Sequence, residues 1–164
     1  MQQLDTHVVR NQVPPLENYN LAVSDIALKE TLWSNGAEQH WKAIALFGAR
    51  LGTSENLHTG HLANKFPPEL QSFDRFGHRI DRVEFHPAYH HLLKLAKEAG
   101  THSVAWTAEQ AGHVAHTALE YLLTQVEAGI CCPITMTYAS IPSLSYNSYL
   151  ADQWIPKIQR ADYD

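Results

Sequence analysis

Apolar residues recur along the chain at helical spacing in several separate stretches. The clearest stretch covers residues 108–128, where apolar side chains follow the i, i+3, i+4, i+7 pattern of one helix face without a break. Thr107 is the expected N-cap of this helix, and Gly129 is the expected residue after its end. The same reasoning predicts shorter helices over residues 24–34 (with Ser24 as N-cap), 37–51, 54–63, 87–98 (with Ala88, His91, Leu92 and Leu95 facing inward), from Pro133 onward, and over 152–160.

Two stretches depart from the helical pattern. In residues 73–85, the Asp-Arg-Phe-Gly run at 74–77 is a turn signal, and Val83 and Phe85 alternate with charged residues, which favours a short β-ribbon or an ordered loop. Residues 1–20 have no helical period, so we expect an extended arm there. The chain lacks the strand–helix alternation of a nucleotide-binding sheet, so the predicted fold is an all-α helical bundle, formed by residues 21–164, with one non-helical excursion.

The distribution of charge changes this picture. The 164 residues carry a formal net charge of −5, which argues against general attraction to nucleic acid or anionic lipid. Only five charged side chains, none of them basic, occur in the 59 residues 98–156, against 24 in the other 105, and residues 128–151 carry none. A lone domain normally solvates its exposed helix faces with charged groups, so part of this stretch is expected to be covered by something else.

The uncharged stretch is not predicted to span a membrane, because Gly129, Pro133 and Pro142 interrupt it and hydroxyl side chains are frequent. The first thirty residues lack the pattern of a signal peptide. The two cysteines, Cys131 and Cys132, are adjacent, and a vicinal pair makes a strained disulfide at best. These observations favour a protein of the reducing cytoplasm.

Candidate chemistry is sparse. The pairs His58/His61 and His113/His116 could place two metal ligands on one helix face, but a site needs three or four, and solvated or capping histidines are favoured. Cys131 and Cys132 have no paired base nearby in sequence and are expected to be structural thiols. The arginines at 75, 79 and 82 alternate with acidic residues, which favours a salt-bridged loop. The nucleophile-elbow, P-loop and dinucleotide-binding motifs do not occur.

The remaining candidate is the run of hydroxyl and aromatic residues from Cys131 to Tyr149. Such a composition suits an apolar pocket wall that carries a few hydrogen-bond donors. It equally suits a core helix whose hydroxyls bond back to the preceding turn. The residues alone leave these two interpretations open.

Several blocks of sequence, in order and in register, resemble the AidB family. These blocks are G-I-C-C-P-I-T-M-T-Y-A (129–139), D-R-F-G-H-R-I-D-R-V-E-F-H-P (74–87), L-G-T-S-E (51–55) and L-A-N-K-F-P-P-E-L (62–70). AidB proteins are FAD-containing relatives of acyl-CoA dehydrogenases and are associated with the bacterial response to DNA alkylation. The similarity extends over about residues 11–164, which makes the match specific.

The resemblance implies that this chain corresponds to the N-terminal helical domain alone. The middle domain of the family, which carries the flavin-binding loop, and the C-terminal helical domain, which carries the catalytic carboxylate and the basic region implicated in DNA contact, have no counterpart in these 164 residues. The chain alone is therefore expected to bind no FAD, to be no enzyme and to hold no DNA. The full-length parent is expected to be an oxidoreductase like the acyl-CoA dehydrogenases, which act on CH–CH bonds.

The resemblance also assigns candidate contact residues. Thr135, Met136, Thr137 and Tyr138 are the expected wall of the flavin and substrate cavity, with Tyr138 where Phe is familiar in the family. The arm (residues 11–19) and the ribbon (residues 74–85) are the expected contacts of a homotetramer. Two other functions are compatible with the sequence: a self-contained helical module that binds a protein through residues 128–151, and, less favoured, a metalloenzyme built on one of the histidine pairs.

Overall fold

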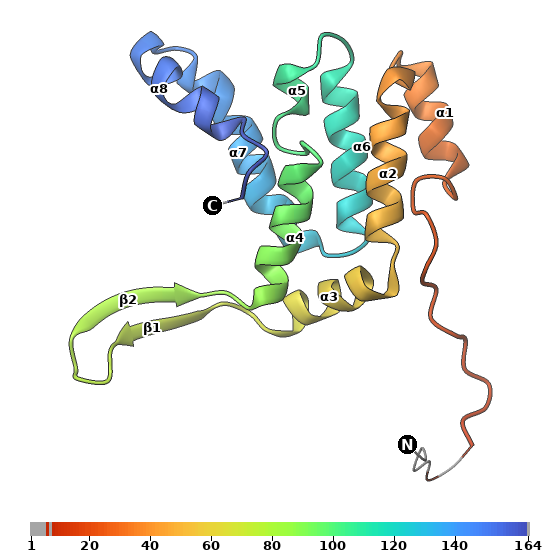
Figure 1. The fold of residues 1–164 in the computed structure, drawn as a ribbon, viewed down its shortest axis with the longest axis horizontal. Helices are drawn as coiled ribbons and strands as arrows, with labels where there is room; N and C mark the ends of the chain where they lie inside the picture. The colour runs from red at the N-terminus through yellow and green to blue at the C-terminus, as the bar shows by residue number, and fades with distance from the viewer. Residues whose placement is uncertain (1–5, 7, 164) are drawn as a thin grey trace.

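The structure, a computed structural model, describes residue 6 and residues 8–163. Its helices pack side by side, α7 and α8 lie to one side, and a two-stranded hairpin and the N-terminal arm extend away from the bundle (Figure 1). The expected all-α fold with one β-ribbon is confirmed. The elements are α1 (Ile26–Ser34), η1 (Glu38–His40, a 3₁₀ turn), α2 (Trp41–Leu51), α3 (Ser54–Lys65), β1 (Glu69–Phe73), β2 (Arg79–Glu84), α4 (Pro87–Glu98), α5 (Val104–Thr107), α6 (Gly112–Thr124), η2 (Ala128–Ile130, a second 3₁₀ turn), α7 (Cys131–Leu144) and α8 (Ser148–Ile158).

The hydrophobic core lies between α2, α4, α6 and the start of α7. Phe47, Leu92, Leu122 and Ile130 are each at most 2% exposed and belong to a single buried cluster. Burying side chains of this size stabilises a fold by about 1.5–3 kcal/mol each. The bundle therefore has a core of its own.

The backbone of residues 19–22 passes directly over α2. Tyr19 N–H donates to Gly52 O and Leu21 N–H donates to Gly48 O, both at 3.2 Å. A Cβ at position 52 would lie 1.7 Å from Tyr19 O, so only glycine allows this approach. The two glycines, one helical turn apart, are the feature that attaches the end of the arm to the bundle.

The ribbon is a hairpin that begins four residues earlier than the sequence indicated. Leu70 pairs with Val83 and Gln71 with Arg82, and the register shifts opposite Asp81, whose φ is +44°. Ion pairs join Arg79 to Asp81 at 2.7 Å and Arg82 to Glu84 at 3.4 Å. The prediction of a salt-bridged ribbon is confirmed.

The long helix expected over residues 108–128 is shorter, and its predicted caps are wrong. Thr107 ends α5, and α6 begins only at Gly112, after Ala111 adopts a left-handed φ of +52°. The break occurs because α5 and α6 pack closely: a Cβ at position 112 would lie 2.6 Å from Val104 O. Gly129 belongs to η2, whose N–H groups are capped by the Glu127 carboxylate.

Two smaller expectations also change. Asp25 caps α1 in place of Ser24, because its carboxylate accepts Leu28 N–H at 2.8 Å. On α4, Leu93 faces the hydrophobic core, whereas His91 lies at the surface and its Nε2 is 2.8 Å from Asn56 Oδ1 of α3. Within residue 6 and residues 8–163, no helix is long and apolar enough to cross a bilayer.

Candidate functional site

The four predicted wall residues occupy one turn of α7, so their side chains leave the helix in different directions. Met136 is 68% exposed, and Thr135 points toward α6. Thr137 donates its hydroxyl to Pro133 O at 2.8 Å and borders a small cavity of about 190 Å³ near the C-terminal segment. Tyr138 points the other way, between α5 and α6. The structure therefore does not place the four side chains on one common surface.

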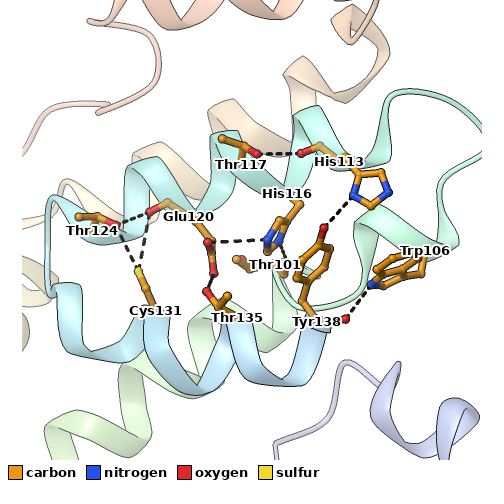
Figure 2. A network of polar contacts seen from close by, with 10 residues as sticks. All are labelled: Thr101, Trp106, His113, His116, Thr117, Glu120, Thr124, Cys131, Thr135 and Tyr138. Atoms are coloured by element: carbon orange, nitrogen blue, oxygen red, sulfur yellow. Dashed lines mark hydrogen bonds and ion pairs between the residues drawn. The ribbon is translucent and has the colours of Figure 1, made fainter. Parts of the chain in front are cut away.

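Tyr138 fixes α7 against α5 and α6, as Figure 2 shows. Its ring is stacked on His116, with centroids 4.1 Å apart, and on Trp106, at 5.2 Å. The Tyr138 hydroxyl lies 3.0 Å from Nδ1 of His113, and the Trp106 indole N–H donates to the Tyr138 carbonyl at 3.0 Å. The hydroxyl that distinguishes this residue from Phe thus has a partner on α6.

A second line of polar contacts in Figure 2 runs from α6 to α7. His116, 6% exposed, donates from Nδ1 to Thr101 O at 2.7 Å and turns its Nε2 toward Glu120 Oε2 at 3.7 Å. The other oxygen of Glu120 accepts the Thr135 hydroxyl at 2.7 Å. The His116 ring, the Glu120 carboxylate and the Thr135 hydroxyl each have a protein partner, so the arrangement serves to orient α7.

The adjacent cysteines are free thiols, Cys131 half-buried and Cys132 exposed, so the expectation of a buried structural thiol is wrong for Cys132. Cys131 Sγ lies 3.2 Å from the Thr124 hydroxyl, and burial raises the pKa of the Cys131 thiol. A thiol with a raised pKa is mostly protonated at neutral pH, and a protonated thiol is a poor nucleophile. The structural interpretation of this cysteine therefore holds.

The histidine pairs do not form a metal site. His58 and His61 are exposed rings 6.3 Å apart, whereas His113 and His116 turn to Tyr138 and Thr101 respectively. The described part of the chain contains no group of three or more His, Cys, Asp or Glu side chains placed to hold a metal ion.

Sequence reasoning missed a buried histidine near the C-terminus. His102 is 1% exposed, and its Nε2–H donates to Arg160 O at 3.0 Å. Burial lowers the pKa of His102, which keeps the ring neutral at pH 7. The contact attaches residues 159–163 to the end of α4, and the sequence around His102 gives no signal of it.

Sequence reasoning also missed a groove between α1 and α6. Its volume is about 450 Å³, and Asp25 is the only charged residue among those that line it. Asp25 and Tyr121 meet at one end through a hydrogen bond of 2.7 Å. The remaining lining residues are Ala27, Leu28, Thr31, Leu32, Asn35, Val114, Thr117 and Ala118.

The uncharged stretch ends in a helix that buries none of its residues. Helix α8 is amphipathic in sequence, yet no residue of Ser148–Ile158 is buried, and its main packing partner is α7. Tyr146 in the preceding turn is 95% exposed, and on α8 Tyr149 is 69% exposed and Trp154 49%. Large aromatic side chains arranged this way are typical of a surface that another protein segment covers.

Comparison with known proteins agrees with this geometry. Residues 11–164 match the family described as the adaptive response protein AidB N-terminal domain. The chain belongs to this AidB N-terminal domain family. It is 46% identical over 141 residues to AidB of Escherichia coli (strain K12), which covers 85% of this chain and 26% of the relative. It is also 28% identical over 127 residues, 73% of this chain and 20% of the relative, to acyl-CoA dehydrogenase family member 11 of Caenorhabditis elegans.

Solved structures share the fold of this AidB-type domain. The apo form of Bd2924 superimposes with a TM-score of 0.80 at 26% identity, covering 91% of this chain and 31% of that one. The crystal structure of Caenorhabditis elegans ACDH-11 in complex with C11-CoA gives a TM-score of 0.75 at 21% identity, covering 96% and 29%, which shows the fold alone. The chain thus spans about a quarter of the length of its sequence relatives and just under a third of these structures.

Proposed function

We propose that this chain is the N-terminal helical domain of an AidB-like, FAD-containing, acyl-CoA dehydrogenase-related protein that takes part in the response to DNA alkylation. Its role there is to supply contact surfaces and part of a cavity wall, and the chemistry belongs to other domains of the parent. We assign residues 21–164 to the body of this domain and residues 1–20 to its arm, of which residues 1–5 and 7 lie outside the described part of the structure. The observation that carries the proposal is α8, which has no buried residue and exposes Tyr149 and Trp154, in a chain that spans about a quarter of its longer relatives.

Helix α8 is the surface on which we expect the middle domain of the parent to pack. An amphipathic helix normally derives most of its stability from burying its apolar face. Covering a Tyr or Trp side chain removes about 150–250 Å² from water. Coverage of Tyr149 and Trp154 would therefore stabilise the domain contact by several kcal/mol.

Within α7, the exposed side of the Thr135–Tyr138 turn is the proposed portion of the cavity wall. Met136 projects outward with 68% exposure, and its flexible thioether suits contact with an apolar acyl chain. The Thr135 hydroxyl is held by Glu120 next to it. Tyr138 supports this wall from behind, because it fixes the position of α7 on α6.

The α1–α6 groove and the cavity beside Thr137 do not by themselves fit FAD. A pyrophosphate group needs N–H donors or cations, whereas the α1–α6 groove offers a carboxylate as its only charge. The cavity beside Thr137 has Lys97 on its wall, but at about 190 Å³ it is well below the range of cofactor sites. The flavin in the proposed parent would therefore be held by other domains.

The proposal extends to the other properties that the resemblance implies. We propose that the arm (residues 11–19) and the hairpin take part in a homotetramer, and that any DNA is held by the C-terminal part of the parent. The net charge of −5 supports the absence of a phosphate-binding surface on this chain. The two free, adjacent thiols support a location in the cytoplasm.

Two observations test the proposal. The reading frame should continue past residue 164 into a domain with a flavin-binding loop, and the parent should purify with a flavin absorbance band that residues 1–164 alone lack. A stop codon after residue 164 would favour a self-contained interaction module. A flavin band at one equivalent in the isolated chain would contradict the division of roles.

A further inference from the structure

The groove between α1 and α6 is a binding surface that the proposed domain contacts do not use. It runs from Asp25 and Tyr121 at one end to Asn35 and Val114 at the other, and apolar side chains such as Leu28 form its floor. Its volume of about 450 Å³ is in the range of sites that hold a few large side chains or a small ligand. Because its lining is mostly apolar and its single charge is negative, a matching ligand combines apolar surface with a positive charge.

The tip of the hairpin has this chemistry. Arg75 and Phe76 lie together in the turn, with the Arg75 guanidinium 4.5 Å from the centre of the Phe76 ring. The Asp74 carboxylate accepts the N–H groups of Phe76 at 2.8 Å and of His78 at 2.9 Å, which fixes the turn beneath them. Phe76 is 69% exposed. The tip is thus a preformed pair of one aromatic ring and one cation.

The hairpin also needs a partner for its own stability. An isolated two-stranded hairpin is at most marginally stable in water. Leu70 is 62% exposed and its cross-strand partner Val83 is 50% exposed, so this apolar pair is uncovered as well. The hairpin projects from one side of the bundle and α1 lies on the opposite side (Figure 1), so the tip cannot reach the groove of its own copy.

We propose that Arg75 and Phe76 of one copy insert into the α1–α6 groove of a second copy. The Phe76 ring lies on the apolar floor, and the Arg75 guanidinium faces the Asp25 carboxylate and the Tyr121 ring, where ion pairing and cation–π attraction both apply. This inference rests on the proposed role of the hairpin as a subunit contact and specifies its receptor. Reciprocal exchange closes a dimer, and one-way exchange builds a larger ring.

Photocrosslinking in the full protein that the reading frame encodes tests this contact. The variant Phe76→p-benzoylphenylalanine, at natural isotope abundance, is mixed with ¹⁵N-labelled protein and irradiated. We expect crosslinked peptide pairs of mixed isotope composition that join residue 76 to residues 25–35 or 114–121. Crosslinks confined to one copy, or to any other segment, would overturn the proposal, as would their absence at all protein concentrations.

One variant inside the groove and one outside it distinguish specific docking from nonspecific association. Thr117 and Thr124 are both exposed on α6, and each donates its hydroxyl to the carbonyl four residues earlier, but only Thr117 lines the groove. We expect Thr117→Trp to lower the crosslink yield at least tenfold, because the indole fills the groove, and Thr124→Trp to leave it unchanged. Equal yields from the two variants, with circular dichroism showing both folded, would contradict the assigned receptor. Because neither variant touches α8 or a flavin-binding loop, failure here leaves the test of the domain assignment unaffected.

Discussion

The glycine at position 48 offers a direct test of how the arm is attached to the bundle. The substitution Gly48→Ala adds one methyl group on the side of α2 that residues 19–22 cross. That Cβ would lie 2.7 Å from Ala22 N and 2.8 Å from both Ala22 Cβ and Asn20 Oδ1. Two of these atoms belong to Ala22, and the neighbouring Leu21 N–H is hydrogen-bonded to α2. The segment that crosses α2 must therefore shift.

The expected change in the free energy of unfolding has one stabilising and two destabilising contributions. Alanine is favoured over glycine within a helix by about 1 kcal/mol. Overpacking costs about 1–3 kcal/mol. Displacing Asn20 also weakens its bonds from Ala22 N at 3.0 Å and to Ala45 O at 2.9 Å, each a contribution of about 0.5–1.5 kcal/mol. The net prediction is a loss of about 1–3 kcal/mol in the free energy of unfolding.

Urea denaturation followed by circular dichroism measures this change, and thermal unfolding should show a melting temperature lower by about 3–10 °C. Gly129→Ala is the control, because its Cβ would meet no backbone atom and only the Glu127 carboxylate, at 3.1 Å, so its stability should change less than that of Gly48→Ala. A Gly48→Ala variant as stable as the wild type would refute the close packing of residues 19–22 on α2.

Three further predictions concern individual polar groups. A backbone N–H of α1 and then the Tyr121 hydroxyl lower the pKa of Asp25, so the charge stabilises the fold fully above about pH 4 and less as pH falls through that lowered pKa. Asp25→Asn should therefore destabilise the fold more at pH 7 than at pH 3 in urea titrations. Burial lowers the pKa of His102, so the neutral ring contributes its full stability above the unfolded pKa of about 6.5, and this stability is lost as pH falls below that value. In His102→Gln the free energy of unfolding should therefore fall less between pH 7.5 and pH 5.5 than in the wild type. Tyr138→Phe should cost about 0.5–1.5 kcal/mol through the lost contact with His113, and Tyr138→Ala about 3–5 kcal/mol.

Local patterns were enough to predict most of the elements, though not all of their bounds. The apolar periods, the turn residues at 74–77 and the position of Pro87 at the start of α4 each act over a few neighbours, and the structure agrees with them. The break between α5 and α6 was missed because Gly112 is required there by packing on Val104, a contact that helical periodicity does not record. His91 was misplaced because a surface partner on α3 determines its direction.

The candidate site depended on the resemblance more than on patterns. The absence of charge over residues 128–151 predicted that another segment covers part of this stretch, and the structure adds that α8 has no buried residue. The environment of Tyr138, whose ring lies between groups on α5 and α6, could not be predicted, because it depends on how three helices cross. The α1–α6 groove was missed for the same reason, since its two walls are about 90 residues apart.

Amide hydrogen exchange of α8 tests the central claim most directly. Exchange is compared for Ser148–Ile158 in the isolated chain of residues 1–164 and in the longer parent, with the buried face of α6 as internal reference. We expect at least tenfold slower exchange of α8 in the parent and no change in α6, because a following domain covers the exposed side chains of α8, Tyr149 and Trp154 among them. Equal exchange of α8 in both proteins would contradict the assignment of this face as a domain contact.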